Sequence, residues 1–169
     1  MNIKEALNKV IGKLDLTKEE MVSVMTQVME GQVVDSELGA LLTALRMKGE
    51  SVSEIVGAAM VMRHKAERLK VTADPIVDTC GTGGDGANTF NISTAAGFVV
   101  AGSGITVAKH GNRAVSSRSG SADVLKCLGV NIGADKATVE RCIADVGIGF
   151  LFAPLMHGAM KHAAGVRKA

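Results

Sequence analysis

The chain contains no tryptophan and no tyrosine, and phenylalanine occurs only four times. Proteins that hold single-stranded nucleic acids usually stack the bases on aromatic side chains, and such a platform is missing here. The formal net charge of +2 is also too small to indicate a nucleic-acid or membrane partner. We therefore expect neither kind of partner.

Cysteine is scarce as well: Cys80, Cys127 and Cys142 are too few and too widely spaced for a disulfide framework or a Cys-x-x-Cys zinc site. No apolar run approaches the roughly 20 residues that a membrane-spanning helix needs. The first residues also lack the apolar core of a signal peptide. These absences favour a cytoplasmic protein, and a hydrophobic content of 47% predicts a substantial aliphatic core.

Residues 3 to about 70 carry only helical patterns. Thr17-x-x-Glu20 and Ser51-x-x-Glu54 are capping boxes, which satisfy exposed N–H groups at a helix start. Two apolar stripes at helical spacing predict core positions or a subunit contact: Met21, Val24, Met25 and Val28, then Leu38, Leu41, Leu42 and Leu45. We interpret residues 1–71 as a helical domain.

From Asp74 onward, short apolar runs alternate with glycine-rich loops and helical patterns. The expected strands are Pro75–Asp78, Ile105–Lys109, Val130–Ile132 and Ile148–Phe152, and the expected helices are Ile92–Ala101, Ser121–Leu128 and Lys136–Val146. This order predicts the α/β class, with a mostly parallel sheet flanked by helices over residues 72–169. About four strands make a small sheet. We therefore expect the sequence to be a piece of a longer protein.

A glycine-rich loop, Gly81-Thr82-Gly83-Gly84-Asp85-Gly86, follows the first expected strand. Such a loop lets the backbone approach a ligand closely, and a helix start favours negative charge. Asn91-Ile92-Ser93-Thr94 adds hydroxyls at that helix start, although simple N-capping explains these residues equally well. The loop therefore predicts a phosphate site.

The same loop matches the Gly-x-Gly-x-x-Gly pattern of dinucleotide-binding oxidoreductase domains, which leaves that function as an alternative. Two features count against it. Asp85 would repel a pyrophosphate, and Lys109-His110 stand where an acid should bind the ribose hydroxyls.

Cations and hydroxyls also gather after the second expected strand. Lys109, Arg113 and Arg118 lie among small residues, and serines follow at positions 116, 117, 119 and 121. Lysine offers a point charge to a phosphate, and arginine binds two oxygens at once. This segment predicts an anion site. His110 is either part of it or a structural histidine, and Cys80 is more typical of a small packed residue.

These segments together resemble the anthranilate phosphoribosyltransferases, which share their fold with the pyrimidine nucleoside phosphorylases. The matching stretches are Gly81–Asp85, Asn91–Thr94, Lys109–Ser117, Gly120–Asp123, Phe152–Pro154, His157, Ala159–Lys161 and Val166–Arg167. The resemblance covers essentially the whole chain, as the N-terminal half of a family member.

The resemblance implies transfer of phosphoribosyl from phosphoribosyl pyrophosphate to anthranilate, the second step of tryptophan biosynthesis from chorismate. It implies catalytic roles for Lys109, His110 and Asn112, and anthranilate binding by Gly81, His110, Asn112 and Arg167. It implies phosphoribosyl pyrophosphate binding by Gly81, Gly83, Gly84, Asp85, Thr89, Asn91, Ile92, Ser93, Thr94, Lys109, Gly111, Asn112, Arg113, Ala114, Val115, Ser116, Ser117 and Ser121.

The resemblance further implies Mg²⁺ as cofactor, with Ser93 as one ligand, and a homodimer formed through the N-terminal helices. The family's acidic pair for magnesium has no counterpart in these residues, so we expect the fragment alone to be inactive. Gly158 and Gly165 stand where the family usually has proline. A pyrimidine nucleoside phosphorylase-like enzyme is the nearest alternative.

Overall fold

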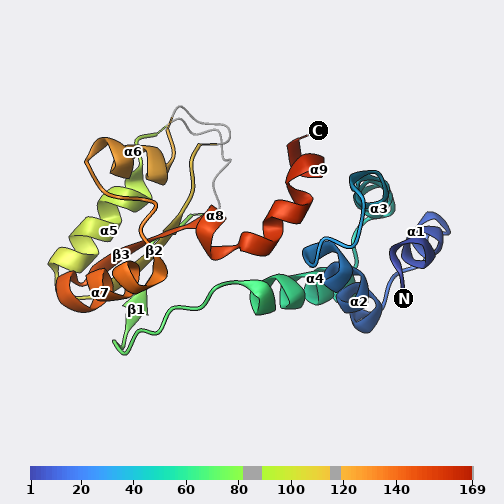
Figure 1. The fold of residues 1–169 in the computed structure, drawn as a ribbon, viewed down its shortest axis with the longest axis horizontal. Coiled ribbons are helices and arrows are strands. Elements are labelled where there is room, and N and C mark those ends of the chain that lie inside the picture. The colour runs from blue at the N-terminus through green and yellow to red at the C-terminus, as the bar shows by residue number, and fades with distance from the viewer. Residues whose placement is uncertain (82–88, 115–118, 169) are drawn as a thin grey trace. The chain divides into compact units, whose positions relative to one another are not determined.

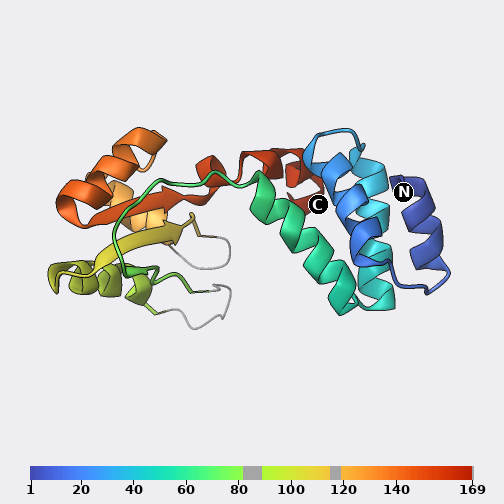
Figure 2. The ribbon, with the colours of Figure 1, turned by 90° about the horizontal axis from the view of Figure 1, so that it is seen from below.

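The computed structural model describes residues 1–81, 89–114 and 119–168. Within it the chain divides into two compact units. One unit contains Met1–Glu67 and the chain from His157 onward, and the other contains Arg68–Met156. The sequence interpretation divides the chain once, near residue 72, whereas the first unit also includes a segment from the far end of the chain. Figures 1 and 2 show the helices of the first unit and the small sheet of the second.

The first unit begins with helices α1 (Ile3–Ile11), α2 (Lys18–Met29), α3 (Asp35–Lys48) and α4 (Val52–Lys65). The two predicted capping boxes are confirmed. The Thr17 and Ser51 side chains accept hydrogen bonds from the backbone N–H groups of Glu20 and Glu54, whose carboxylates accept from the cap residues in return. A further box at the start of α1 joins Asn2 and Glu5.

An aliphatic core holds these helices together. The predicted stripes on α2 and α3 supply much of it, although Leu42 is 42% exposed. A second cluster brings in the C-terminal segment, which forms a 3₁₀-helix η1 (Gly158–Ala163) and α9 (Ala164–Lys168). Buried members of the two clusters are Ile3, Ala6, Val10, Leu16, Met21, Val24, Leu41 and Leu45, and then Val28, Met29, Leu38, Val61 and Ala163.

The second unit is a parallel sheet with helices on both faces. Its elements are β1 (Ile76–Val77), α5 (Ile92–Gly102), β2 (Thr106–Gly111), α6 (Ser121–Cys127), α7 (Lys136–Val146), β3 (Ile148–Phe152) and α8 (Ala153–Met156). The described strands pair in the order β1-β2-β3, all parallel. The predicted α/β class is therefore confirmed, and the carboxyl ends of the strands meet at one edge.

Side chains alternate between the two faces of this sheet. Residues of β2 alternate between partly exposed and buried, so that Lys109 lies on one face and His110 on the other. In the parallel pairing of β2 with β3, Lys109 lies beside Phe150 and Ala108 lies beside Gly149. Helix α5 covers the Lys109 face and α7 covers the opposite face, as Figure 2 shows from below.

The strand expected at Val130–Ile132 is wrong. These residues lie in the turn between α6 and α7, after Gly129 at φ 86°. The backbone N–H of Val130 donates to the carbonyl of Leu125 at the end of α6, over 2.9 Å, and is therefore not available to a neighbouring strand. The helical patterns were expected to continue to about residue 70, but α4 ends at Lys65.

None of the helices in the described residues is long and apolar enough to cross a bilayer.

Candidate functional site

Two helix starts and two strand ends meet in the second unit. The side chain of Asn91, which precedes α5, donates to Ser119 Oγ over 3.1 Å. The backbone N–H of Ala122 in α6 donates to the carbonyl of Asn112, just after β2, over 3.1 Å. The starts of α5 and α6 are therefore tied together at the carboxyl end of β2, where ligands of parallel sheets bind.

The amine of Lys109 is buried at this junction. The residue is only 2% exposed, and Nζ donates to Ser93 Oγ over 3.3 Å. Burial lowers the pKa of Lys109, and electrostatic interactions with Asp78 and Cys80 oppose that shift. Among the described residues, the hydrogen-bond partner of the Lys109 amine is an uncharged hydroxyl. An anion that binds beside this buried cation is therefore stabilised by a strong charge–charge interaction.

His110 lies on the other face of the sheet. Its backbone N–H donates to Asp78 Oδ1 over 3.2 Å, and its Nδ1 lies 3.9 Å from the Sγ of Cys80. Asp78 Oδ1 also accepts from the backbone N–H of Cys80, over 2.9 Å. The structure thus groups His110 with the end of β1, and groups Lys109 with the start of α5.

Other predicted site residues lie around the same junction. Gly111 ends β2, and a Cβ built on it would lie 3.0 Å from Ser121 Oγ, so these two residues are neighbours. Arg113 Nη1 is 3.7 Å from Asp123 Oδ1. The backbone N–H of Ala114 donates to Asp123 over 3.0 Å and is therefore engaged within the protein.

The remaining predicted residues differ in burial and in position. Thr94 is buried, whereas Gly81, Thr89 and Ile92 are exposed. Arg167 lies in α9, in the first unit. The predicted site residues that lie outside the described part of the chain are Thr82, Gly83, Gly84, Asp85, Gly86, Val115, Ser116, Ser117 and Arg118.

Three residues that shape the site were not predicted as site residues, although Asp123 lies in the matching stretch Gly120–Asp123. Asp78 links the ends of β1 and β2, and Thr79 Oγ1 donates to the carbonyl of Ser93 over 2.8 Å. Asp123 accepts from two backbone N–H groups beside the anion segment. The available signals were position alone: Asp78 and Thr79 follow a strand, and Asp123 lies three residues after Gly120 at a helix start.

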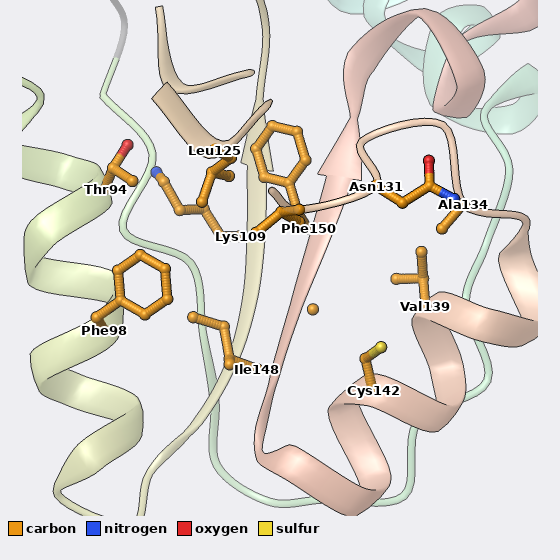
Figure 3. Close-up of a pocket in the computed structure, with 12 residues that line it drawn as sticks. Thr94, Phe98, Lys109, Leu125, Asn131, Ala134, Val139, Cys142, Ile148 and Phe150 are labelled. Atoms are coloured by element: carbon orange, nitrogen blue, oxygen red, sulfur yellow. The ribbon is translucent and has the colours of Figure 1, made fainter. Parts of the chain in front are cut away.

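An apolar cavity of about 180 Å³ lies along β3 (Figure 3). Phe98 of α5 and Ile148 line it on one side, and Val139 and Cys142 of α7 line it on the other. Lys109 brings the only charged side chain among its lining residues, at the end nearest Thr94. The amine of Lys109 therefore has apolar surroundings toward this cavity, which accounts for the lowered pKa.

The described residues contain no group of three or more His, Cys, Asp or Glu side chains that could hold a metal ion. They do offer hydroxyls: Ser93 Oγ, and Thr94 Oγ1, which is buried without a hydrogen-bond partner in the described part of the chain. Magnesium accepts such oxygens, and commonly takes its other ligands from water and substrate phosphates. These residues fit a Mg²⁺ ion that arrives on a phosphorylated substrate.

Two family models match nearly the whole chain. The model described as "Glycosyl transferase family, a/b domain" matches residues 73–169, and "Glycosyl transferase family, helical bundle domain" matches residues 4–66. The chain belongs to this glycosyl transferase family. Residues of both domain types, the helical bundle and the α/β domain, are therefore present in the chain.

Several relatives of this chain carry the name anthranilate phosphoribosyltransferase. Anthranilate phosphoribosyltransferase of Anaeromyxobacter sp. (strain K) is 63% identical over 166 residues, which are 98% of this chain and 49% of the relative. The crystal structure of anthranilate phosphoribosyltransferase from Thermus thermophilus is similar with a TM-score of 0.86 and 46% identity, over 96% of this chain and 50% of that one.

A structure of the Saccharomyces cerevisiae enzyme of the same name, in complex with PRPP and Mg, also has a TM-score of 0.86, at 28% identity. It is matched over 98% of this chain and 50% of its own. The chain thus spans about half the length of the curated relatives it matches.

Proposed function

We propose that the complete protein transfers the phosphoribosyl group of phosphoribosyl pyrophosphate to anthranilate. The products are N-phosphoribosyl-anthranilate and pyrophosphate. The observation that carries this proposal is the buried amine of Lys109 beside Ser93, at a junction of strand ends and helix starts. The relatives' shared name and the yeast complex with PRPP and Mg support the same substrate.

Catalysis of this transfer requires that the two substrates are positioned for attack and that the charge developing on the leaving group is stabilised. The anthranilate amine attacks the anomeric carbon, and the bond to pyrophosphate breaks with its electrons on the departing oxygen. Negative charge therefore grows on the leaving group, and the Lys109 ammonium stabilises it there. Ser93 and Thr94 would hold Mg²⁺, which neutralises charge on the diphosphate when bound.

The acceptor belongs, in this proposal, on the other side of the junction. The side chains of Lys109 and His110 point to opposite faces of the sheet, so the donor and the acceptor would approach the end of β2 from different sides and meet there, where the amine can reach the anomeric carbon. Asn112 would orient the anthranilate carboxylate, and His110 would accept the proton that the amine loses. An aryl amine is nucleophilic without a strong base, so His110 acts late in the reaction.

Calorimetry tests the donor site directly. The chain should bind phosphoribosyl pyrophosphate in the presence of MgCl₂, and removing the metal with EDTA should weaken binding at least about tenfold, because Mg²⁺ offsets the diphosphate charge. Binding of NAD instead would favour an oxidoreductase. With the complete protein, phosphorolysis of a pyrimidine nucleoside without transfer to anthranilate would favour the nucleoside phosphorylase alternative.

We further propose that a second copy of the chain covers one side of α4. Val52, Ile55, Val56 and Met60 are 78%, 58%, 42% and 51% exposed, and their spacing places them along one side of that helix. Met47, at the end of α3, adds a side chain that is 85% exposed. Several exposed apolar side chains along one side of a helix are typical of a protein–protein contact.

Ile55→Lys is expected to convert the dimer to a monomer, because a charge would be buried in the proposed contact. Light scattering after size-exclusion chromatography measures the change. Val146→Lys, at an apolar position of α7 that is 69% exposed, is the control and should remain dimeric. An unmodified chain that is monomeric at all concentrations would contradict the proposal.

A further inference from the structure

Asp123, in the first turn of α6, connects the end of β2 to the residue that precedes α6. Its Oδ2 accepts hydrogen bonds from the backbone N–H groups of Ala114, over 3.0 Å, and Gly120, over 2.9 Å. Ala114 follows the end of β2, and Gly120 precedes the start of α6. One carboxylate oxygen therefore connects a strand end to a helix start.

The backbone itself is in contact at this point. A Cβ built on Gly120 would overlap backbone atoms of Asn112, Arg113 and Ala114, so that only glycine allows so close an approach. The hydrogen bond from Ala122 N–H to the Asn112 carbonyl, 3.1 Å, lies in the same contact. Asp123 thus fixes a packed arrangement of main chain, not a loose one.

The carboxylate stays charged in this setting. Hydrogen bonds from the backbone N–H groups of Gly120 and Ala114 hold the pKa of Asp123 below its ordinary value, and Arg113 and Lys126 add to the effect. Its hydrogen bonds are therefore charge-assisted and stronger than those of a neutral acceptor. A negative charge beside an anion site does not itself favour binding of the anion. Any contribution of Asp123 to binding must therefore come from the backbone groups of Ala114 and Gly120 that it holds in place.

We propose that Asp123 is a positioning residue of the phosphoribosyl pyrophosphate site, holding Asn112–Ala114 against the start of α6 so that Lys109, Asn112 and Ser121 keep the spacing a diphosphate needs. This inference rests on the proposed function. Asp123 touches no substrate in this arrangement. It acts through the main chain of its neighbours.

Asp123→Asn tests the proposal with a matched control. Asparagine has the same size but is a weaker, uncharged acceptor, so we expect affinity for magnesium pyrophosphate to fall about tenfold in calorimetry. Asp123→Glu keeps the charge and should recover part of that loss. The control is Asp135→Asn: Asp135 caps α7 through Thr138 N–H and its pKa is also lowered, mainly by that hydrogen bond.

Asparagine caps a helix about as well as aspartate, so Asp135→Asn should change the melting temperature little and leave affinity unchanged. Equal losses of affinity in both variants, or none in Asp123→Asn, would overturn the positioning role and leave the proposed function standing. If the complete protein binds no pyrophosphate, the proposed function fails. In that case amide hydrogen exchange still tests whether Asp123 holds the main chain. The amides of Ala114 and Gly120 should exchange faster in Asp123→Asn than in the unmodified chain, and unchanged rates would overturn the inference.

Discussion

Lys109→Met is expected to abolish measurable binding of phosphoribosyl pyrophosphate with Mg²⁺ while raising the melting temperature of the chain. Methionine keeps the apolar stem that packs against α5 but removes the buried charge. Loss of a buried charged partner typically costs about 2–5 kcal/mol of binding free energy, or roughly thirtyfold to several thousandfold in affinity. Calorimetry and thermal unfolding measure the two effects on the same sample.

Lys109→Met is expected to lower affinity but to raise stability, and the gain in stability follows from the pKa of Lys109. Burial lowers that pKa, so the charged amine is less favourable in the folded chain than in the unfolded one. This unfavourable contribution is fully present below the lowered pKa and disappears as the pH rises through it toward the ordinary value of 10.5. The stability gain of Lys109→Met should therefore be largest near neutral pH and shrink in alkali.

A suitable control is Lys126→Met. Lys126 is an exposed lysine in the last turn of α6, so the same substitution there removes a solvated charge. We expect its affinity and melting temperature to remain close to those of the unmodified chain. If Lys109→Met binds the substrate as well as Lys126→Met does, Lys109 is not part of the donor site.

Glu54→Gln should produce the largest loss of stability in the helical unit. The side chain of Glu54 is 1% exposed; Oε1 accepts from Leu16 N–H over 2.9 Å, and Oε2 accepts from Lys48 Nζ over 3.0 Å. Breaking a buried ion pair from one side typically costs about 3–5 kcal/mol, because the other charge stays buried. Asp15 retains contact with Lys48, at 2.6 Å, so we expect about 3 kcal/mol in chemical denaturation.

The pH dependence of unfolding provides a second measure of Glu54. Burial raises its pKa, but hydrogen bonds from Leu16 and Ser51 and the ion pair with Lys48 outweigh burial, so the pKa is lowered from 4.5. The stabilising contribution is therefore complete above about pH 4.5 and is lost as the pH falls through the lowered pKa. In Glu54→Gln this acid-dependent loss should be smaller.

Glu20→Gln is the matched control, because Glu20 occupies the same capping-box position at the start of α2. Its side chain is 26% exposed and pairs with Lys9, which is 27% exposed. A partly solvated pair of this kind contributes little, so we expect a loss of at most about 1 kcal/mol. A loss in Glu20→Gln as large as that in Glu54→Gln would show that capping, not burial, is responsible.

Local signals made much of the fold predictable. The capping boxes at Thr17 and Ser51 involve residues three positions apart, and they correctly located the starts of α2 and α4. The strand expected at Val130–Ile132 was wrong, because a short apolar run looks alike in a strand and in a turn that packs against a cavity. The sequence cannot tell these apart without knowing what lies beside them.

The sequence by itself determined the α/β class, the helical unit and the gathering of cations and hydroxyls after β2, since each depends on residue type and short-range spacing. Only the tertiary structure decided that Lys109 lies beside Ser93 whereas His110 lies beside Cys80. It also decided that Asp123 is the residue that connects β2 to α6. The physical reason is that strand register and main-chain contacts between distant segments depend on the packing of the whole unit, which no local pattern encodes.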